Sequence, residues 1–194
     1  MMLSADAQNL LFRDARTANA FTSEPVTDEQ MRDIYDLVKY APTAMNQQPL
    51  RIVLVRSPEA RERLVAHMND GNKAKTAAAP LVAVLAADLD FHHELPKVFP
   101  IRPGAREAFA GNESGRVASA VFNATLQVGY FILGVRAAGL AAGPMTGFDR
   151  DELSKEFFPD GDHTVLAVVN LGKPVDQGFD RLPRLTYDEV VTAA

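Results

Sequence analysis

The chain has 194 residues, 47% hydrophobic and 23% charged, a composition typical of one folded domain with a buried core. Its formal net charge of −5 at pH 7 argues against nucleic acid as the main partner, because phosphate backbones require clustered Lys and Arg. There is no cysteine, which excludes disulfides, thiol catalysis and cysteine-ligated metals.

Helical signals dominate the first part of the chain. A short helix is predicted around residues 7–13. Thr27 and Gln30 form a capping box for a second helix, which Pro42 stops. Apolar residues recur at helical spacing on its inner face: Met31, Ile34, Leu37, Val38 and Ala41.

Strands and helices then alternate. We expect a strand at 51–56, and a helix that begins at Ser57 and Pro58 and is ended by a turn at 69–71. The apolar run 81–87 is expected to be a central strand covered on both faces. A third strand is predicted at 163–171. Asp149 with Glu152 and Thr186 with Glu189 indicate two further helix starts.

Residues 88–115 form the least regular region, with several Pro, Gly and Phe residues. A connection of this length in a compact domain is usually a lid or a binding loop. His92 and His93 lie among acidic residues, which invites a metal interpretation. We favour surface or pocket-lining histidines and no metal, because adjacent histidines point in different directions and no metal-binding spacing is present.

The stretch 117–140 predicts a long apolar helix. Asn123, Gln127 and Arg136 interrupt it, which is unusual for a membrane span. We interpret it as the central helix of a soluble, cytoplasmic protein, covered on all sides, with a second subunit supplying part of the cover. The first residues show no basic flank followed by an apolar run, so we expect no secretory signal. A loop rich in Gly, Pro and Thr is expected at 143–148. The whole chain, 1–194, is predicted to be a single α+β or α/β sandwich domain.

Motifs for several enzyme classes are absent. There is no GxGxxG after a strand, no GxxxxGK[ST], no GxSxG and no HExxH. What remains is a dispersed set of basic, amide and small residues. The arginines near residues 13–16 and 181–184 could bind an anion or simply be solvated, and the amide-rich loop 43–47 could contact a ligand or be an ordinary connection.

Taken together, several stretches resemble the nitroreductase superfamily, and specifically its malonic semialdehyde reductase (3-hydroxypropanoate dehydrogenase) branch. The stretches are ARTANAF, APTAMNQQP, NKAK, FHHELPKVFP, TLQVGYFILGVRAAGLAAGPMTGFD and PRLTYDEV. The pair ARTANAF and GPMTGFD is the most specific. The resemblance covers nearly the whole chain.

The resemblance implies an α+β fold, a three-layer sandwich around a mixed sheet with a long central helix. It also implies a homodimer with FMN at the subunit interface, reduced by NADH or NADPH, and a small-molecule substrate. The reaction expected from the branch is reduction of malonic semialdehyde to 3-hydroxypropanoate. A broad nitro or quinone reductase is the alternative within the enzyme class, and a flavin-binding protein without turnover is the alternative outside it.

The resemblance further implies the site residues. The predicted cofactor-binding residues are Arg16, Thr17, Asn19, Thr43, Ala44, Met45, Asn46, Asn72, Lys75, Pro144, Met145, Thr146, Gly147, Arg181 and Arg184. Of these, 43–46 are expected to contact the flavin of the second subunit. Candidate substrate residues are His92, His93 and Arg102. No catalytic side chain is expected, because the flavin would carry the reaction. Many superfamily members have a basic residue where Asn19 stands and an aromatic residue where Leu50 stands. The phosphate contact is therefore expected to rely more on the tail arginines, and Leu50 offers no aromatic ring for substrate stacking.

Overall fold

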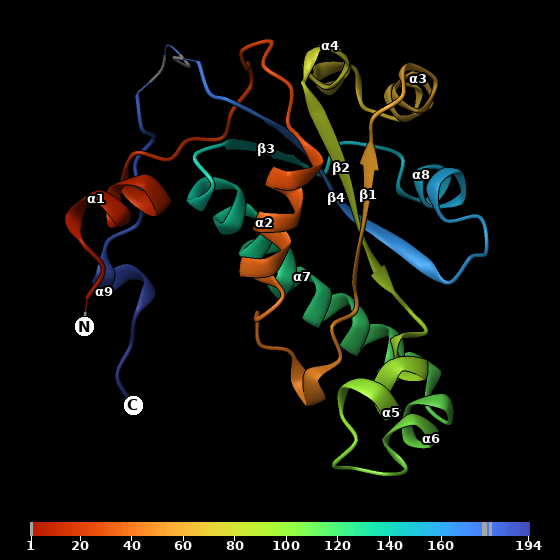
Figure 1. Ribbon diagram of the computed structural model, residues 1–194. Helices are drawn as coiled ribbons and strands as arrows, with labels where there is room; N and C mark the ends of the chain where they lie inside the picture. Colours follow the sequence, from red (N-terminus) through yellow and green to blue (C-terminus); the bar gives the residue numbers. More distant parts are fainter. Residues whose placement is uncertain (1, 176–177, 179) are drawn as a thin grey trace.

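The computed structural model describes residues 2–175, 178 and 180–194. Four strands form one sheet in the order β1-β2-β4-β3 (Figure 1). They are β1 (Leu50–Val55), β2 (Leu81–Asp88), β3 (Ala141–Met145) and β4 (His163–Gly172). All three strand pairings are antiparallel. The sheet formed by the described residues is therefore antiparallel, and the prediction of a mixed sheet is wrong.

The connection between β1 and β2 explains why these two strands are antiparallel. It consists of two short helices, α3 (Pro58–Ala66) and α4 (Asp70–Ala78). Figure 1 shows both helices at the end of the sheet where β1 finishes. The chain therefore enters β2 from the end at which it left β1, and the two strands run in opposite directions, whereas a parallel pair needs a full crossover.

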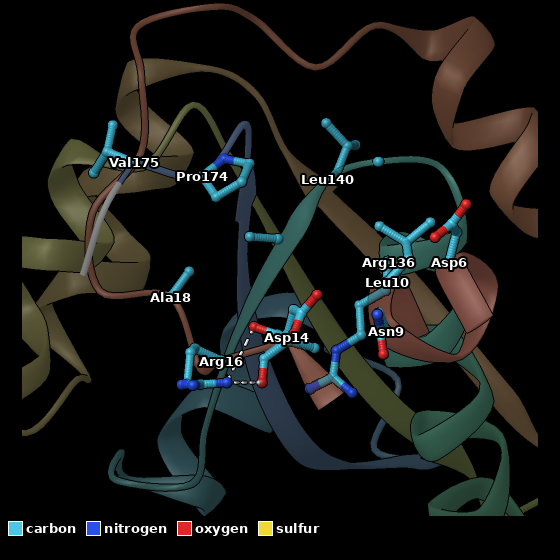
Figure 2. A pocket seen from close by; sticks show the side chains of 13 residues that line it. Asp6, Asn9, Leu10, Asp14, Arg16, Ala18, Arg136, Leu140, Pro174 and Val175 are labelled. Atoms are coloured by element: carbon cyan, nitrogen blue, oxygen red, sulfur yellow. Dashed lines mark hydrogen bonds between the residues drawn. The ribbon is translucent and has the colours of Figure 1, made fainter. Parts of the chain in front are cut away.

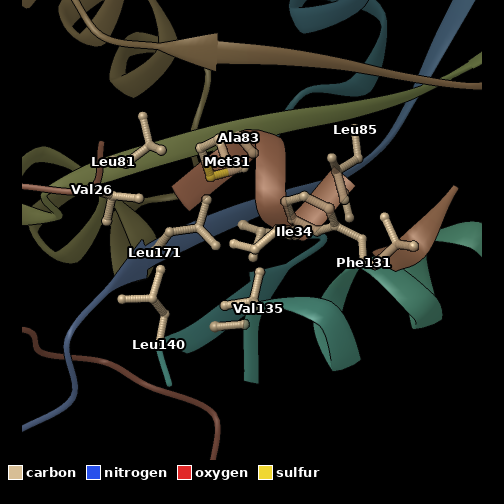
Figure 3. Close-up of a cluster of buried hydrophobic side chains, with 14 residues drawn as sticks. Val26, Met31, Ile34, Leu81, Ala83, Leu85, Phe131, Val135, Leu140 and Leu171 are labelled. Carbon is tan, nitrogen blue, oxygen red and sulfur yellow. The ribbon is translucent and has the colours of Figure 1, made fainter. Parts of the chain in front are cut away.

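The sheet is covered on both faces, which confirms the three-layer sandwich. β2 has no residue more than 8% exposed, and its side chains alternate between two cores as the strand period requires. Leu81, Ala83 and Leu85 face α2 (Asp28–Val38) and α7 (Glu113–Ala137). Figure 3 shows these residues around Ile34 and Phe131. The opposite face packs against α3, α4 and α8 (Arg150–Phe157).

The long helix α7 ends in a glycine-based cap. Gly139 has φ of +72°, its amide donates to the Arg136 carbonyl, and the Leu140 amide donates to the Val135 carbonyl. These two bonds form a Schellman motif, with Leu140 buried beside the helix it follows. The predicted helix is confirmed, but it begins four residues earlier and ends three residues earlier than expected.

One face of α7 is not covered by the described chain. Phe122, Leu126 and Tyr130 are 66%, 43% and 42% exposed, and their spacing of four places them on one stripe of the helix. The expected cover on all sides is therefore absent within one subunit. By length and composition α7 would also pass as a membrane span, yet its other face packs on α2 and on the sheet.

Several local predictions differ from the structure. Leu37 is 59% exposed rather than buried. Asn69 caps α4, so the chain continues as a helix after the turn predicted at 69–71. Residues 143–145, which were expected to belong to a loop at 143–148, instead form the end of β3 and pair with β4.

The remaining elements are short. The irregular region contains η3 (Phe91–Glu94), α5 (Leu95–Val98) and α6 (Ala105–Ala110). The N-terminal helix is α1 (Ala5–Gln8), which is continued by the π-helical η1 (Asn9–Arg13). Two further elements are single turns, η2 (Ala44–Asn46) and α9 (Tyr187–Val190). Both predicted capping boxes, at Thr27 and Thr186, are present.

Candidate functional site

The N-terminal segment 16–19 lies along the outer edge of β3. The Ala18 amide donates to the Ala142 carbonyl at 3.1 Å. Gly143 makes this close approach possible, because a Cβ atom there would lie 2.3 Å from the Ala18 carbonyl oxygen. The Arg16 guanidinium folds back onto the carbonyls of residues 13–15.

Helix α4 brings two more predicted residues to this edge. The Lys75 ammonium donates to Asn19 Oδ1 at 3.3 Å. The Asn72 amide group donates to the Gly147 carbonyl at 2.9 Å, and a Cβ on Gly147 would lie 2.6 Å from that amide nitrogen. Segments 16–19, 72–75 and 144–147 therefore meet at one place, although they are far apart in the sequence.

Within the loop after β3 the side chains point in different directions. Met145 is buried, and its sulfur accepts a hydrogen bond from the Thr76 hydroxyl at 3.8 Å. Thr146 is exposed and Pro144 is half-buried. A ligand at this edge would therefore meet Met145 through its backbone and Thr146 through either backbone or side chain.

Positive charge collects near the N-terminal segment. Arg181 donates to the carbonyls of Phe12, Arg13 and Ala15. Among the described residues, the Arg184 guanidinium donates to the carbonyls of residues 182 and 183. In the part of the chain that the structure describes, no carboxylate forms an ion pair with Arg16, Lys75, Arg181 or Arg184. These cations can therefore accept an external anion.

A cavity of about 620 Å³ adjoins this segment (Figure 2). Arg16 and Ala18 line it, together with Arg136 and Leu140 from the end of α7. Burial, and secondarily the charge of Arg181, lowers the pKa of Arg136, whose guanidinium donates to the Leu11 carbonyl. The cavity lining thus combines the guanidinium groups of Arg16 and Arg136 with the carboxylates of Asp6 and Asp14 and with apolar side chains such as Leu10 and Leu140.

The predicted residues 43–46 lie elsewhere. η2, which contains three of them, is close to α5 and α6, at the opposite end of the molecule from α4 (Figure 1). Asn46 Nδ2 donates to the Val98 carbonyl at 2.8 Å. One subunit therefore does not bring residues 43–46 to the segments that meet beside β3.

The candidate substrate residues accompany this second group. Arg102 Nη1 lies 3.9 Å from the sulfur of Met45. His93 Nδ1 lies 3.2 Å from Arg106 Nη2, and its ring is 4.2 Å from that of His92. His92 is only 3% exposed, and burial, followed by the neighbouring His93, lowers its pKa.

Asp90, His92 and His93 are close enough to hold a metal ion between them. Their surroundings oppose that use. Asp90 pairs with Arg116 at 3.3 Å, and Arg106 points at His93. Two fixed guanidinium charges repel a dication.

Comparison with known proteins identifies the family. The sequence profile of the Nitroreductase family matches residues 13–173. The chain belongs to the nitroreductase family. It is therefore an oxidoreductase of the nitroreductase type.

Relatives of this family align over almost the entire chain. A Streptomyces coelicolor protein with the provisional name NADH dehydrogenase/NAD(P)H nitroreductase is 65% identical over 99% of this chain and 98% of its own. A protein of Streptomyces griseus with the same provisional name is 62% identical over the same shares. The branch that reduces malonic semialdehyde is not among the functions these names state.

Solved structures share the fold at lower identity. A provisionally named nitroreductase from Exiguobacterium sibiricum, solved in complex with FMN, has a TM-score of 0.86 at 19% identity and covers 100% of this chain and 99% of its own. The provisionally named nitroreductase ydfN of Bacillus subtilis has a TM-score of 0.85 at 24% identity and covers 98% and 99%. The nitroreductase-like fold expected from the sequence is thus confirmed.

Proposed function

We propose that this nitroreductase-family protein is an FMN-dependent NAD(P)H oxidoreductase. The observation that carries the proposal is the meeting of Asn19 with Lys75, and of Asn72 with Gly147, beside β3. The names of the Streptomyces relatives and the FMN complex of the Exiguobacterium protein support it.

The residues at this edge suit an anionic, planar cofactor. Gly143 and Gly147 let the segments at this edge pack closely together, because a Cβ atom would collide with the Ala18 carbonyl oxygen at the first position and with Asn72 Nδ2 at the second. Cations that form no ion pair with a carboxylate among the described residues stand on either side, Lys75 at one end and Arg16 with Arg181 or Arg184 at the other. Guanidinium groups are well suited to a phosphate because they donate in a planar fork.

Within this proposal, each segment has its own role. FMN supplies hydride and electron transfer when it is bound. Arg16, Thr17 and the tail arginines would hold its phosphate, and Asn72 and Lys75 would contact the pyrimidine edge. Lys75 would also stabilise negative charge that develops there. The backbone of 144–147 would orient the ring edge while leaving one face open.

We further propose that the functional unit is a homodimer. Residues 43–46 lie at the opposite end of the subunit from α4 (Figure 1), so they could contact a flavin at the 16–19 edge only from another copy. The exposed stripe Phe122, Leu126 and Tyr130 on α7 is an apolar surface that a second subunit would cover.

Within this enzyme class, malonic semialdehyde is the substrate we propose first. This substrate carries a carboxylate. Met45 belongs to the loop that would face the flavin, and the exposed guanidinium of Arg102 lies next to Met45. Arg106, which lies 3.2 Å from His93 Nδ1, adds a second fixed positive charge to the irregular region. A neutral nitroaromatic or quinone has no carboxylate to pair with Arg102. The effect of Arg102 on substrate binding therefore distinguishes a malonic semialdehyde reductase from a broad nitro or quinone reductase.

Anaerobic spectroscopy tests the proposal. The purified protein, reconstituted with FMN, should be bleached by NADH or NADPH and re-oxidised by malonic semialdehyde faster than by a nitroaromatic. Faster re-oxidation by the nitroaromatic would favour the broad reductase. Bound FMN that neither nucleotide bleaches would indicate a flavin-binding protein without turnover, and absence of FMN binding would refute the proposal.

Arg102→Ala tests the substrate assignment separately. It should raise the KM for the semialdehyde about tenfold or more, equivalent to loss of one charge-assisted hydrogen bond, and leave the KM for a nitroaromatic unchanged. Lys97→Ala is the matched control, because Lys97 is another cation of the same region, 81% exposed and near Glu94. An unchanged KM for the semialdehyde in Arg102→Ala would refute the assignment.

A further inference from the structure

The loop that would face the second flavin is held in a strained backbone conformation. Met45, Asn46 and Gln48 have φ values of +49°, +51° and +47°. A non-glycine residue in the left-handed region costs roughly 1–2 kcal/mol. Such a conformation persists only where surrounding contacts determine it, and it is most often found at functional sites.

Polar side chains of α7 supply those contacts. Ser119, Asn123 and Gln127 are spaced by four residues and so lie on one stripe of the helix. Asn123 Oδ1 accepts a hydrogen bond from the Ala44 amide at 2.8 Å, and Gln127 Oε1 accepts one from the Leu50 amide at 3.0 Å. The two side chains thus hold the beginning and the end of the loop.

The middle of the loop is held by the same stripe. The side chain of Gln47 is 1% exposed. Its Oε1 accepts from the Ser119 hydroxyl at 3.0 Å and from Asn123 Nδ2 at 3.2 Å. Asn123 therefore bonds the loop twice, once through its oxygen and once through its nitrogen.

The amide side chains of this stripe are buried. Asn123 and Gln127 are 3% and 8% exposed in a helix whose other buried residues are small or apolar. Buried amides are costly unless they are hydrogen-bonded. Asn123 Nδ2 donates to the carbonyl and hydroxyl oxygens of Ser119. Among the described residues, the other hydrogen-bond partners of these two amides all belong to residues 44–50. Their role is therefore to fix the loop.

We propose that Asn123 is a positioning residue for the flavin site, assisted by Ser119 and Gln127. It fixes the strained loop 43–48 in the conformation that contacts the cofactor bound to the second subunit. The inference rests on the proposed function. Because the strain is imposed before the cofactor arrives, FMN binding does not have to supply it, which is how preorganisation raises affinity. The central helix of one subunit would then control cofactor binding in the other.

Two variants of the full-length protein test the inference by FMN titration, followed by flavin fluorescence. Asn123→Ala should raise the Kd for FMN about tenfold. Val135→Ala is the matched control, because Val135 is a fully buried residue of the same helix that packs on the sheet side. It should lower the melting temperature comparably and leave the Kd unchanged.

A second measurement does not depend on the cofactor. Hydrogen exchange of a peptide covering 43–50 should be faster in Asn123→Ala than in Val135→Ala. Adding Gln48→Gly to Asn123→Ala should restore part of the affinity, because glycine adopts the left-handed conformation without strain. A purely structural role for Asn123 predicts no such rescue.

The outcomes separate the two proposals. If the unaltered protein binds FMN and Asn123→Ala binds it with the same Kd, the positioning role is refuted and the proposed function stands. A Kd raised equally by Val135→Ala also refutes it, because the effect would then be general destabilisation. If the unaltered protein does not bind FMN, both are refuted.

Discussion

Replacing Gly143 by Ala places a methyl group where the N-terminal segment crosses β3. The added Cβ would lie 2.3 Å from the Ala18 carbonyl oxygen and 3.5 Å from Asn170 Cβ. A carbon and an oxygen normally approach to about 3.3 Å, so the segment has to move outward by about 1 Å. Both contacting atoms are close to the backbone, and a side-chain rotation cannot remove the overlap.

The expected cost has two parts. Displacement of the segment breaks the hydrogen bond from the Ala18 amide to the Ala142 carbonyl, which contributes about 0.5–1.5 kcal/mol. Overpacking of a buried position adds about 1–3 kcal/mol. We therefore expect the free energy of unfolding to fall by about 2–4 kcal/mol. With an m-value near 3 kcal/mol/M in urea, the midpoint falls by about 1 M.

Urea unfolding followed by circular dichroism measures this cost, and FMN titration measures the displacement of Arg16 and Asn19. The Kd should rise at least tenfold. Gly71→Ala is the control, because a Cβ at Gly71 meets nothing within 4 Å and Ala favours the helix there. If Gly143→Ala has the same urea midpoint and the same Kd for FMN as the unaltered protein, the close packing of segment 16–19 against β3 is refuted.

Further variants test the electrostatics and the caps. Lys75→Met should make the reduction potential of bound FMN more negative by on the order of 30 mV, which corresponds to a loss of about 1.4 kcal/mol in stabilisation of the reduced flavin. Lys75→Arg keeps the charge and should leave the potential unchanged. An unchanged potential in Lys75→Met would contradict the placement of the Lys75 charge near the flavin. Arg181→Ala should weaken FMN binding more than Arg184→Ala in the same titration, because only Arg181 reaches the N-terminal segment; the reverse order would contradict this. Because burial lowers the pKa of His92, the unfolded chain binds this proton at a higher pH than the folded protein does, so stability falls as pH drops below about 6.5. Thermal melts between pH 7.5 and 5 should show a weaker pH dependence in His92→Phe, and an identical slope would refute the assignment. Gly139→Ala should lower the free energy of unfolding by about 1–2 kcal/mol in urea, because Gly139 has φ of +72°; an unaltered midpoint would contradict the cap.

Strong local signals in the sequence predicted much of the fold. The Thr27 and Thr186 capping boxes and the Ser57–Pro58 helix start depend on neighbouring residues only, and each is present. The run 81–87 is central because it has no polar face. Strand β3 was missed because AAGPM has no strand pattern of its own and becomes a strand only by pairing with β4. Leu37 fits the helical spacing, yet α7 packs beside another face of α2.

The site was predictable only in part, for the same reason. The sequence shows Asn19 and Lys75 as ordinary polar residues, and only the fold brings them within 3.3 Å of each other. Their membership in one site was expected from the family resemblance rather than from spacing. The role of Asn123 and Gln127 left a visible signal, polar residues four apart in an apolar helix, but their partners in the loop cannot be inferred from it.

The segment beside β3 also protects the sheet. An edge strand exposes unpaired amides and carbonyls that can recruit another chain. Here Pro144 removes one amide donor, the Ala18 amide occupies the Ala142 carbonyl, and the Thr22 amide occupies the Lys173 carbonyl. Truncation through residue 22 would therefore uncover a self-complementary edge. Loss of the cofactor segment and a tendency to aggregate would then arise together, and an N-terminal deletion that precipitates would reveal nothing about flavin chemistry.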